Sequence, residues 1–243
     1  MDSLSIVIPA YNEEKRLPLT LETVLRYLDR QTFSFVEILV VDDGSRDGTA
    51  VLVERVAARD PRLRLLRNPG NRGKGYSVRH GTLEGQGEYI LFTDADLSSP
   101  IEELAKLRDA VEREKAAVAI GSRALDRSLV GVHQPFFREA SGRFFNLAMR
   151  LVTGLPFRDT QCGFKLFQRE AAREIFARQT LDGFGFDVEA LYLAQLLGYR
   201  VVEVPVRWND VEGTKVSLLH GLKAFLDPLR VRWNHLSGRY GRT

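Results

Sequence analysis

Two aspartates, Asp94 and Asp96, follow a run of apolar and β-forming residues in the sequence ILFTDADLSSP (90–100). In an extended segment residues i and i+2 point to the same side, so both carboxylates can approach one cation. Hard oxygen ligands favour Mg²⁺ or Mn²⁺, which usually keep waters and accept phosphate oxygens as further ligands. The pair therefore indicates a divalent-metal site. The alternative is an ordinary strand-end aspartate followed by a cap for the helix expected at Pro100.

A second polar cluster follows another apolar run, at Asp42 and Asp43 in VVDDGSRDGT. Carboxylates here can accept hydrogen bonds from a nucleobase or a ribose hydroxyl, or they can belong to a turn before the next helix. The glycine-rich segment 68–81 offers backbone N–H groups, Arg72 and Lys74 to anionic oxygens. It matches neither the Walker loop nor GxGxxG, so its phosphate signal is weak when taken alone.

Short apolar runs alternate with helical patterns over the first 125 residues. The expected strands cover residues 4–11, 36–45, 62–68, 88–96 and 116–123. Helical spacing is found at Leu17, Leu21, Val24, Leu25 and Leu28, again at Leu52 and Val56, and after Pro100. Near-continuous apolar strands suit burial on both faces. The pattern predicts a doubly wound, mostly parallel α/β sheet with flanking helices, which binds ligands beyond the carboxyl ends of its strands.

The second half of the chain is less regular. Helices are expected at 135–154, 168–179 and 186–198, strands at the end of 158–167 and at 199–208, and a basic amphipathic helix at 217–236, broken near Pro228. We find no repeat or clear linker. The sequence predicts one domain over residues 1–212, with a nucleotide-binding half (1–125) and an acceptor half (126–212), followed by a basic C-terminal segment (213–243).

Composition narrows the class of protein. The 243-residue chain has a net charge of +3, but residues 215–243 carry six Lys/Arg against one acid, Asp227, which is +5. Such a segment can meet an anionic membrane or nucleic acid, or can be a solvated helix face. The single cysteine, Cys162, excludes a disulfide framework and is expected to be a small apolar filler. No run reaches the ~18 apolar residues of a membrane span, so we expect a soluble or peripheral protein.

Taken together, the motifs resemble the family 2 nucleotide-sugar glycosyltransferases of the GT-A fold. The resemblance is sharpest to dolichyl-phosphate β-glucosyltransferases and the related polyprenyl-phosphate glycosyltransferases. It extends from about residue 4 to about residue 210, and its motifs occur in the order SIVIPAYNEEKRLP, VDDGSRDGT, NRGKGYSVRHG, FTDADLSSP, GSR, RDTQCGFKLF, GFGFDVE and EVPVRW.

This resemblance implies roles by position. Residues implied in the uridine or guanosine pocket are Pro9, Tyr11, Glu13 and Asp42, with Asp43 nearby. Asp94 and Asp96 correspond to a DxD pair that holds Mg²⁺ or Mn²⁺ and the diphosphate. Residues implied in phosphate binding are Arg123, Arg138 and Arg143. Residues implied in the sugar and acceptor pocket are Asp159, Gln161 and Lys165. The DxD correspondence favours the metal interpretation of the two aspartates.

Members of this kind invert, so an acceptor oxygen attacks C1 as the nucleoside diphosphate leaves. A lipid monophosphate is ionised at pH 7 and needs positive charge rather than a base. A hydroxyl acceptor needs a base, for which Asp159, Asp187 and Glu189 are candidates. The last two can also be ordinary first-turn acids of a helix.

The expected reaction is therefore glucose transfer from UDP-glucose to dolichyl or polyprenyl phosphate at the cytoplasmic face of the membrane. Alternatives are mannose transfer from GDP-mannose, or transfer to a soluble or protein hydroxyl.

Eukaryotic relatives of the glucosyl type carry an N-terminal anchor that the sequence does not show. Membrane contact would then depend on the C-terminal helix, whose apolar side is Leu218, Leu219, Leu222, Phe225, Leu226, Leu229 and Trp233. Two other classes fit less well. A response-regulator domain with Asp42 and Asp43 as its acidic pocket leaves half of the chain and the segment 92–100 unexplained. Nucleic acid is not expected as a partner, although the basic tail alone would allow it.

Overall fold

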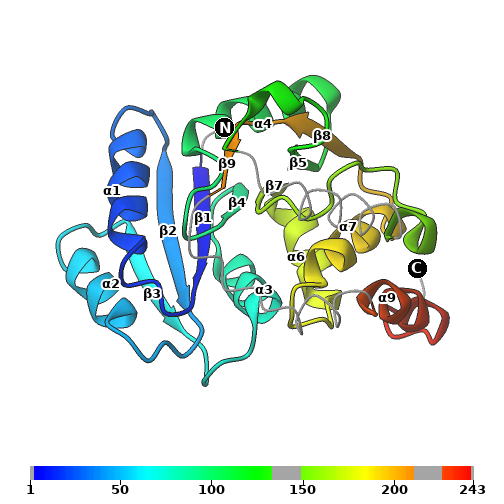
Figure 1. Cartoon of the computed structure of the whole chain (residues 1–243), viewed down its shortest axis with the longest axis horizontal. Helices are drawn as coiled ribbons and strands as arrows, with labels where there is room; N and C mark the ends of the chain where they lie inside the picture. The colour runs from blue at the N-terminus through cyan, green and yellow to red at the C-terminus, as the bar shows by residue number, and fades with distance from the viewer. Residues whose placement is uncertain (1–2, 133–148, 211–225, 242–243) are drawn as a thin grey trace.

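A seven-stranded sheet runs through the computed structural model, which describes residues 3–132, 149–210 and 226–241 (Figure 1). The strands are β1 (Ser3–Ala10), β2 (Phe35–Asp42), β3 (Leu63–Arg67), β4 (Tyr89–Thr93), β5 (Val118–Ser122), β7 (Phe164–Gln168) and β8 (Val201–Pro205). Their order is β3-β2-β1-β4-β7-β5-β8, and only β7 is antiparallel to its neighbours. The predicted mostly parallel sheet is confirmed. Because β7 comes from the second half and lies between β4 and β5, the two halves share one sheet.

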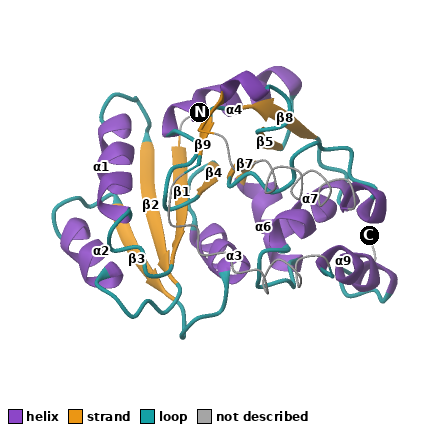
Figure 2. Ribbon diagram, in the orientation of Figure 1, coloured by secondary structure: helices purple, strands orange, loops and turns teal. Residues whose placement is uncertain are grey.

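Helices cover both faces of this sheet (Figure 2). The helices on one face are α1 (Leu17–Leu28), α2 (Thr49–Ala57) and α4 (Leu104–Glu114), the last preceded by the 3₁₀ turn η1 (Ile101–Glu103). Those on the other are α3 (Lys74–Glu84), α6 (Arg169–Arg178) and α7 (Phe186–Leu196). Strand residues alternate between the two layers: Ile38 of β2 packs into the first cluster and Leu39 into the second. This double burial explains the near-continuous apolar runs in the sequence.

Helix α3 occupies the segment that the sequence marks only as glycine-rich. Its buried residues are mostly small, so no apolar stripe announces a helix. The small residues are needed for close packing. A Cβ at Gly81 would lie 2.5 Å from Cγ1 of Val7 in β1, and a Cβ at Gly75 would lie 2.5 Å from the carbonyl oxygen of Leu181. Helix α3 therefore approaches both the sheet and the loop 179–185.

The remaining described elements lie at the periphery. They are η2 (Arg127–Leu129), the short parallel strands β6 (Val130–Val132) and β9 (Trp208–Asn209), and helix α9 (Asp227–Leu236). Helix α9 packs beside α7 at the end of the molecule opposite β3 (Figure 1). Pro228 is the second residue of this helix and lies in its first turn, where proline is common. Helices are expected at 135–154 and 217–236, and of these segments residues 135–148 and 217–225 fall outside the described residues. Within the described part, no helix has the length and apolarity that crossing a bilayer requires.

Replacing Gly75 with alanine is expected to lower the free energy of unfolding by about 1–3 kcal/mol, although alanine is the better helix former. The added methyl group meets backbone oxygens of Leu181 and Gly183, which cannot rotate away. Urea denaturation measures the change. The control is Gly183→Ala, where the added group meets no atom within 4 Å. Equal stability of the two variants would contradict this account of α3.

Candidate active site

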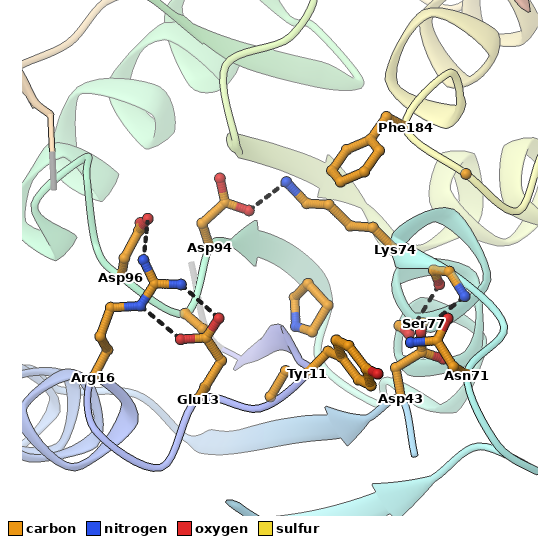
Figure 3. A pocket seen from close by; sticks show the side chains of 15 residues that line it. Tyr11, Glu13, Arg16, Asp43, Asn71, Lys74, Ser77, Asp94, Asp96 and Phe184 are labelled. Atoms are coloured by element: carbon orange, nitrogen blue, oxygen red, sulfur yellow. Dashed lines mark hydrogen bonds and ion pairs between the residues drawn. The ribbon is translucent and has the colours of Figure 1, made fainter. Parts of the chain in front are cut away.

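A cavity of about 620 Å³ lies at the carboxyl ends of β1 and β4 (Figure 3). Its walls come from the end of β1 and the start of α1, the glycine-rich start of α3, the turn after β4, and residues 183–184. The structure brings seven of the residues chosen from the sequence into this lining: Pro9, Tyr11, Glu13, Asp43, Lys74, Asp94 and Asp96. It adds several that sequence reasoning did not single out, among them Arg16, Asn71, Ser77 and Phe184.

The two aspartates after β4 each face a cation. Oδ1 of Asp94 lies 2.6 Å from Nζ of Lys74, and Oδ2 of Asp96 lies 3.7 Å from Nη1 of Arg16. Burial alone lowers the pKa of Lys74, but the charges of Asp94 and Asp187 outweigh it and raise that pKa above its ordinary value. Lys74 is therefore charged at neutral pH. The figure shows both aspartates pointing into the same cavity (Figure 3).

The donor set suits a hard divalent cation. Burial, followed by the charge of Asp94, raises the pKa of Asp96 above its ordinary value. Among the described residues there is no cluster of three or more His, Cys, Asp or Glu that could hold a metal alone. Two carboxylates with waters and phosphate oxygens are the usual environment of Mg²⁺. Asp94 and Asp96 therefore fit a metal that is completed by the substrate.

The turn that carries these aspartates is held in an uncommon backbone conformation. Leu97 has a φ of 47°, in the left-handed region that residues with a Cβ rarely adopt. The backbone N–H of Leu97 donates to the carbonyl of Asp94 at 3.2 Å, and the N–H and hydroxyl of Ser98 donate to Oδ1 of Asp96. No side chain of the described residues caps the following 3₁₀ turn, and Asp96 lines the cavity instead.

Gly163, which precedes β7, lies against Asp94. The carbonyl of Gly163 accepts a hydrogen bond from the backbone N–H of Asp94 at 3.2 Å. The residue before it, Cys162, is buried. A Cβ at Gly163 would lie only 1.9 Å from Oδ2 of Asp94. The glycine of the QCGFK motif thus makes room for a carboxylate supplied by another motif. Burial raises the pKa of the Cys162 thiol to about 11, so it is no nucleophile at neutral pH.

The paired aspartates at the end of β2, Asp42 and Asp43, have different surroundings. Asp43 lines the cavity and accepts hydrogen bonds from the side-chain amide of Asn68 and the backbone N–H groups of Arg72 and Gly73, at 2.8–2.9 Å. It therefore shapes the glycine-rich segment from which Lys74 projects. Asp42 is buried behind it, and its Oδ1 accepts the N–H of Ser45 at 3.3 Å. The nucleobase role expected for this pair stays a prediction.

A second group of predicted residues lies beside the cavity, around Arg123. Its guanidinium donates to both oxygens of Asp159 at 2.7 and 2.9 Å, and its face covers the ring of Trp208. Asp159 is buried, and its Oδ1 also accepts the N–H of Gln161. Burial by itself raises the pKa of Asp159, but the Arg123 guanidinium outweighs it and holds that pKa below the ordinary value. Arg138 and Arg143 lie outside the described residues.

The other two candidate bases are also occupied. Asp187 forms a buried ion pair with Lys165, whose ammonium group donates to the carbonyl of Cys162 at 2.6 Å as well. Glu189 is fully buried and accepts hydrogen bonds from Thr180 and Leu181 of the loop 179–185. No candidate base in this group has a carboxylate without a protein partner.

The loop 179–185 closes one side of the cavity and is the main feature that sequence reasoning missed. The backbone N–H of Tyr76 donates to the carbonyl of Asp182 at 3.1 Å, and Phe184 extends over Lys74, with Nζ 6.0 Å from its ring centre. From the other side, Glu189 accepts a hydrogen bond from the hydroxyl of Tyr240 at 2.7 Å. The glycines at the start of α3 were the available signal, because a Cβ at Gly73 would lie 2.4 Å from the carbonyl oxygen of Asp182 and so only glycine allows this close approach.

Replacing Arg123 with methionine is expected to lower the free energy of unfolding at pH 7 by about 3 kcal/mol, because Asp159 stays buried without its counter-charge. We take the low end of the usual range since the Arg123 side chain is 32% exposed. Urea denaturation of the double variant Arg123→Met with Asp159→Asn should show a smaller loss.

The effect of this substitution on the free energy of unfolding should depend on pH. The depressed pKa of Asp159 stabilises the wild type above the unfolded pKa, and this contribution is lost as the pH falls through the folded value. In Arg123→Met, burial raises the pKa of Asp159 instead. The difference in the free energy of unfolding between variant and wild type should therefore become smaller from pH 7 to pH 4. A gap that widens would contradict the pairing.

Comparison with known proteins agrees with this geometry. The model of the family described as "Glycosyl transferase family 2" matches residues 5–176. A dolichyl-phosphate beta-glucosyltransferase of Trichomonas vaginalis is 36% identical over 94% of this chain and 72% of its own length. The Mus musculus protein of the same name is 37% identical over 98% and 77%, and that of Saccharomyces cerevisiae 35% over 98% and 76%.

Solved structures show the same fold at lower identity. A glucosyl-3-phosphoglycerate synthase from Mycobacterium tuberculosis, in complex with Mn²⁺, UDP and glucosyl-3-phosphoglycerate, is 20% identical with a TM-score of 0.67, over 100% of this chain and 81% of that one. The mannosyltransferase PcManGT from Pyrobaculum calidifontis, in complex with GDP-Man and Mn²⁺, is 18% identical with a TM-score of 0.62, over 96% and 65%. From the family model, the relatives and the shared GT-A architecture, the chain is a glycosyltransferase that belongs to family 2.

Proposed function

We propose that this glycosyltransferase moves glucose from UDP-glucose to dolichyl or polyprenyl phosphate, with inversion at C1 and with the help of Mg²⁺ or Mn²⁺. The observation that carries the proposal is the meeting of Asp94 and Asp96 in one cavity at the carboxyl ends of the strands, opposite two cations. The names of the relatives at 35–37% identity support the sugar and the acceptor.

Donor binding falls to residues 1–125 in this proposal. Asp94 and Asp96 hold the metal, which when bound stabilises the charge of the leaving diphosphate. Lys74, charged and beside Asp94, lies within reach of the same phosphates and adds to that stabilisation. Tyr11 and Asp43 line the part of the cavity away from the metal ligands, where the nucleoside fits. The loop 179–185 excludes water from the donor on the α3 side.

Acceptor binding falls to residues 126–212 together with Arg123. The carboxylates of Asp159, Asp187 and Glu189 are all engaged by protein partners, so none is free to deprotonate a hydroxyl. A lipid phosphate avoids this need because it is already ionised at pH 7. Asp159 fixes the Arg123 guanidinium, which can then bind such a phosphate. A phosphate oxygen forms the new bond to C1 as the bond from C1 to UDP breaks, and no proton is transferred.

Contact with the cytoplasmic face of a membrane is proposed for the C-terminal segment 213–243. In helix α9 and the residue before it, the side chains of Leu226, Leu229, Trp233 and Leu236 are 53%, 55%, 66% and 77% exposed. Their spacing of three and four residues places them on one side of the helix. The opposite side packs on α7 through the fully buried Val231. An exposed apolar stripe on a helix that also carries Arg230 and Arg232 suits an anionic bilayer surface.

The central test is transfer of radiolabelled sugar into organic-extractable lipid phosphate, with UDP-glucose and GDP-mannose offered separately. Asp96→Ala is expected to lower the rate at least about 100-fold, because it removes charge stabilisation of the leaving group. The matched control is Asp109→Ala, an exposed aspartate of α4. Label from GDP-mannose alone would change the sugar. Nucleotide-sugar hydrolysis without a lipid product would contradict the lipid acceptor but agree with the proposed donor site.

Membrane contact is tested by flotation with vesicles that contain anionic lipid. Trp233→Ser is expected to weaken binding about 10-fold or more, because a large side chain no longer leaves water for the bilayer. The control is Val51→Ser, which removes a 56% exposed apolar side chain from α2, far from α9. If both variants float as the wild type does, α9 does not touch the membrane.

A further inference from the structure

Arg16 lies at the edge of the donor cavity with one side of its guanidinium unused (Figure 3). Its Nε and Nη2 donate to the two carboxylate oxygens of Glu13 at 2.7 and 2.6 Å. Nη1 is buried and makes no hydrogen bond to any described residue. The nearest charge opposite it is Oδ2 of Asp96, 3.7 Å away, which is an ion-pair distance and too long for a hydrogen bond.

An unsatisfied buried donor on a charged group is costly and calls for an explanation. Simple flexibility does not supply one, because Glu13 itself is held in place. Glu13 is buried, its backbone N–H donates to Oγ1 of Thr49 at 2.8 Å, and its carbonyl accepts the N–H groups of Arg16 and Leu17. The guanidinium is thus clamped along one edge, and its free edge is directed toward the aspartate pair.

The charge around Nη1 points to an anionic ligand. Asp96 is the carboxylate nearest to it, and a divalent metal between Asp94 and Asp96 would draw that charge away from Arg16. The free edge of the guanidinium then needs another anion, and phosphate oxygens are the anions that accompany Mg²⁺ in such sites. Arginine is suited to this task because its fork of N–H groups can serve a carboxylate and a phosphate together.

The position of Arg16 in the cavity indicates which of the two donor phosphates it can reach. Arg16 and Asp96 lie at one end of the cavity, whereas Asp43, Asn71 and Ser77 lie at the other, beyond Tyr11 (Figure 3). In the proposed function the nucleoside occupies the Asp43 end, so the sugar-bearing phosphate is the one nearer to Arg16.

We propose that Nη1 of Arg16 binds the sugar-bearing β-phosphate of the donor and that Glu13 positions the guanidinium for this contact. The proposal rests on the proposed function and adds to it a role for Arg16, which lies within the motif SIVIPAYNEEKRLP. Arg16 then serves the phosphate that leaves with UDP, on the side of the metal ligands opposite Lys74.

The test compares UDP with UMP, which lacks the β-phosphate, by isothermal titration calorimetry in Mg²⁺. Arg16→Gln is expected to lower the affinity for UDP about 10- to 100-fold, which is the loss expected for a hydrogen bond between charged groups. The affinity for UMP should change less than about 3-fold. Arg16→Lys keeps the charge and should recover part of the UDP affinity. The matched control is Arg26→Gln on the exposed face of the same helix, where only the surface pair with Glu22 is lost.

A second measurement separates phosphate binding from a structural role. Arg16→Gln removes a positive charge next to Asp96, so Mn²⁺ alone, followed by electron paramagnetic resonance, should bind as tightly as in the wild type or more tightly. A variant that merely disturbs Asp96 or Glu13 would lose Mn²⁺ and UDP together, and that result overturns the proposal.

Two further outcomes would overturn it: an equal loss of UDP and UMP, which places Arg16 at the nucleoside, and no loss of either. Failure of the donor part of the proposed function looks different, because the wild type itself would then not bind UDP. If the wild type binds GDP in place of UDP, the comparison of GDP with GMP decides the role of Arg16 in the same way.

Discussion

The structure is organised around the repulsion between Asp94 and Asp96, two carboxylates that share one partly enclosed cavity. Their charge is balanced from two sides, by Lys74 at the start of α3 and by Arg16 at the start of α1. Each cation depends on another buried carboxylate. Asp43 shapes the glycine-rich segment that carries Lys74, and Glu13 clamps Arg16. The ends of β1, β2 and β4 therefore have to meet at one edge, which is what parallel strands in neighbouring positions do.

The part of the structure proposed to bind the acceptor is built on a different principle, which is the fixation of cations by buried acids. Asp159 holds Arg123 in a two-pronged ion pair, and Asp187 holds Lys165 between β7 and α7. Breaking such pairs is costly, so they provide rigid positive groups more than net stability. In the proposed function, the fixed guanidinium of Arg123 and the engaged carboxylates suit an acceptor that arrives with its own negative charge.

The C-terminal segment is connected to the donor cavity through the loop 179–185. Tyr240 donates to Glu189, Asn234 donates to Thr180, and the side chain of Asp227 lies over Gly185, where a Cβ would come within 2.4 Å of its carboxylate. The same loop contributes Gly183 and Phe184 to the cavity lining. The helix proposed to meet the membrane is thus in direct contact with the loop that forms part of the cavity wall.

Sequence alone determined the sheet and the principal carboxylates. The apolar runs of β1, β2 and β4 and the polar residues at their ends are local patterns, and the DxD spacing is readable without a fold. It did not reveal that β7 runs antiparallel between β4 and β5, that Gly163 makes room for Asp94, or that Arg16 and Phe184 line the cavity. It also left open whether Asp159, Asp187 and Glu189 are bases, and only their tertiary partners show that their carboxylates are engaged. The reason is physical: periodicity records which residues are buried, whereas charge pairing and close approach depend on segments that meet only in the folded chain.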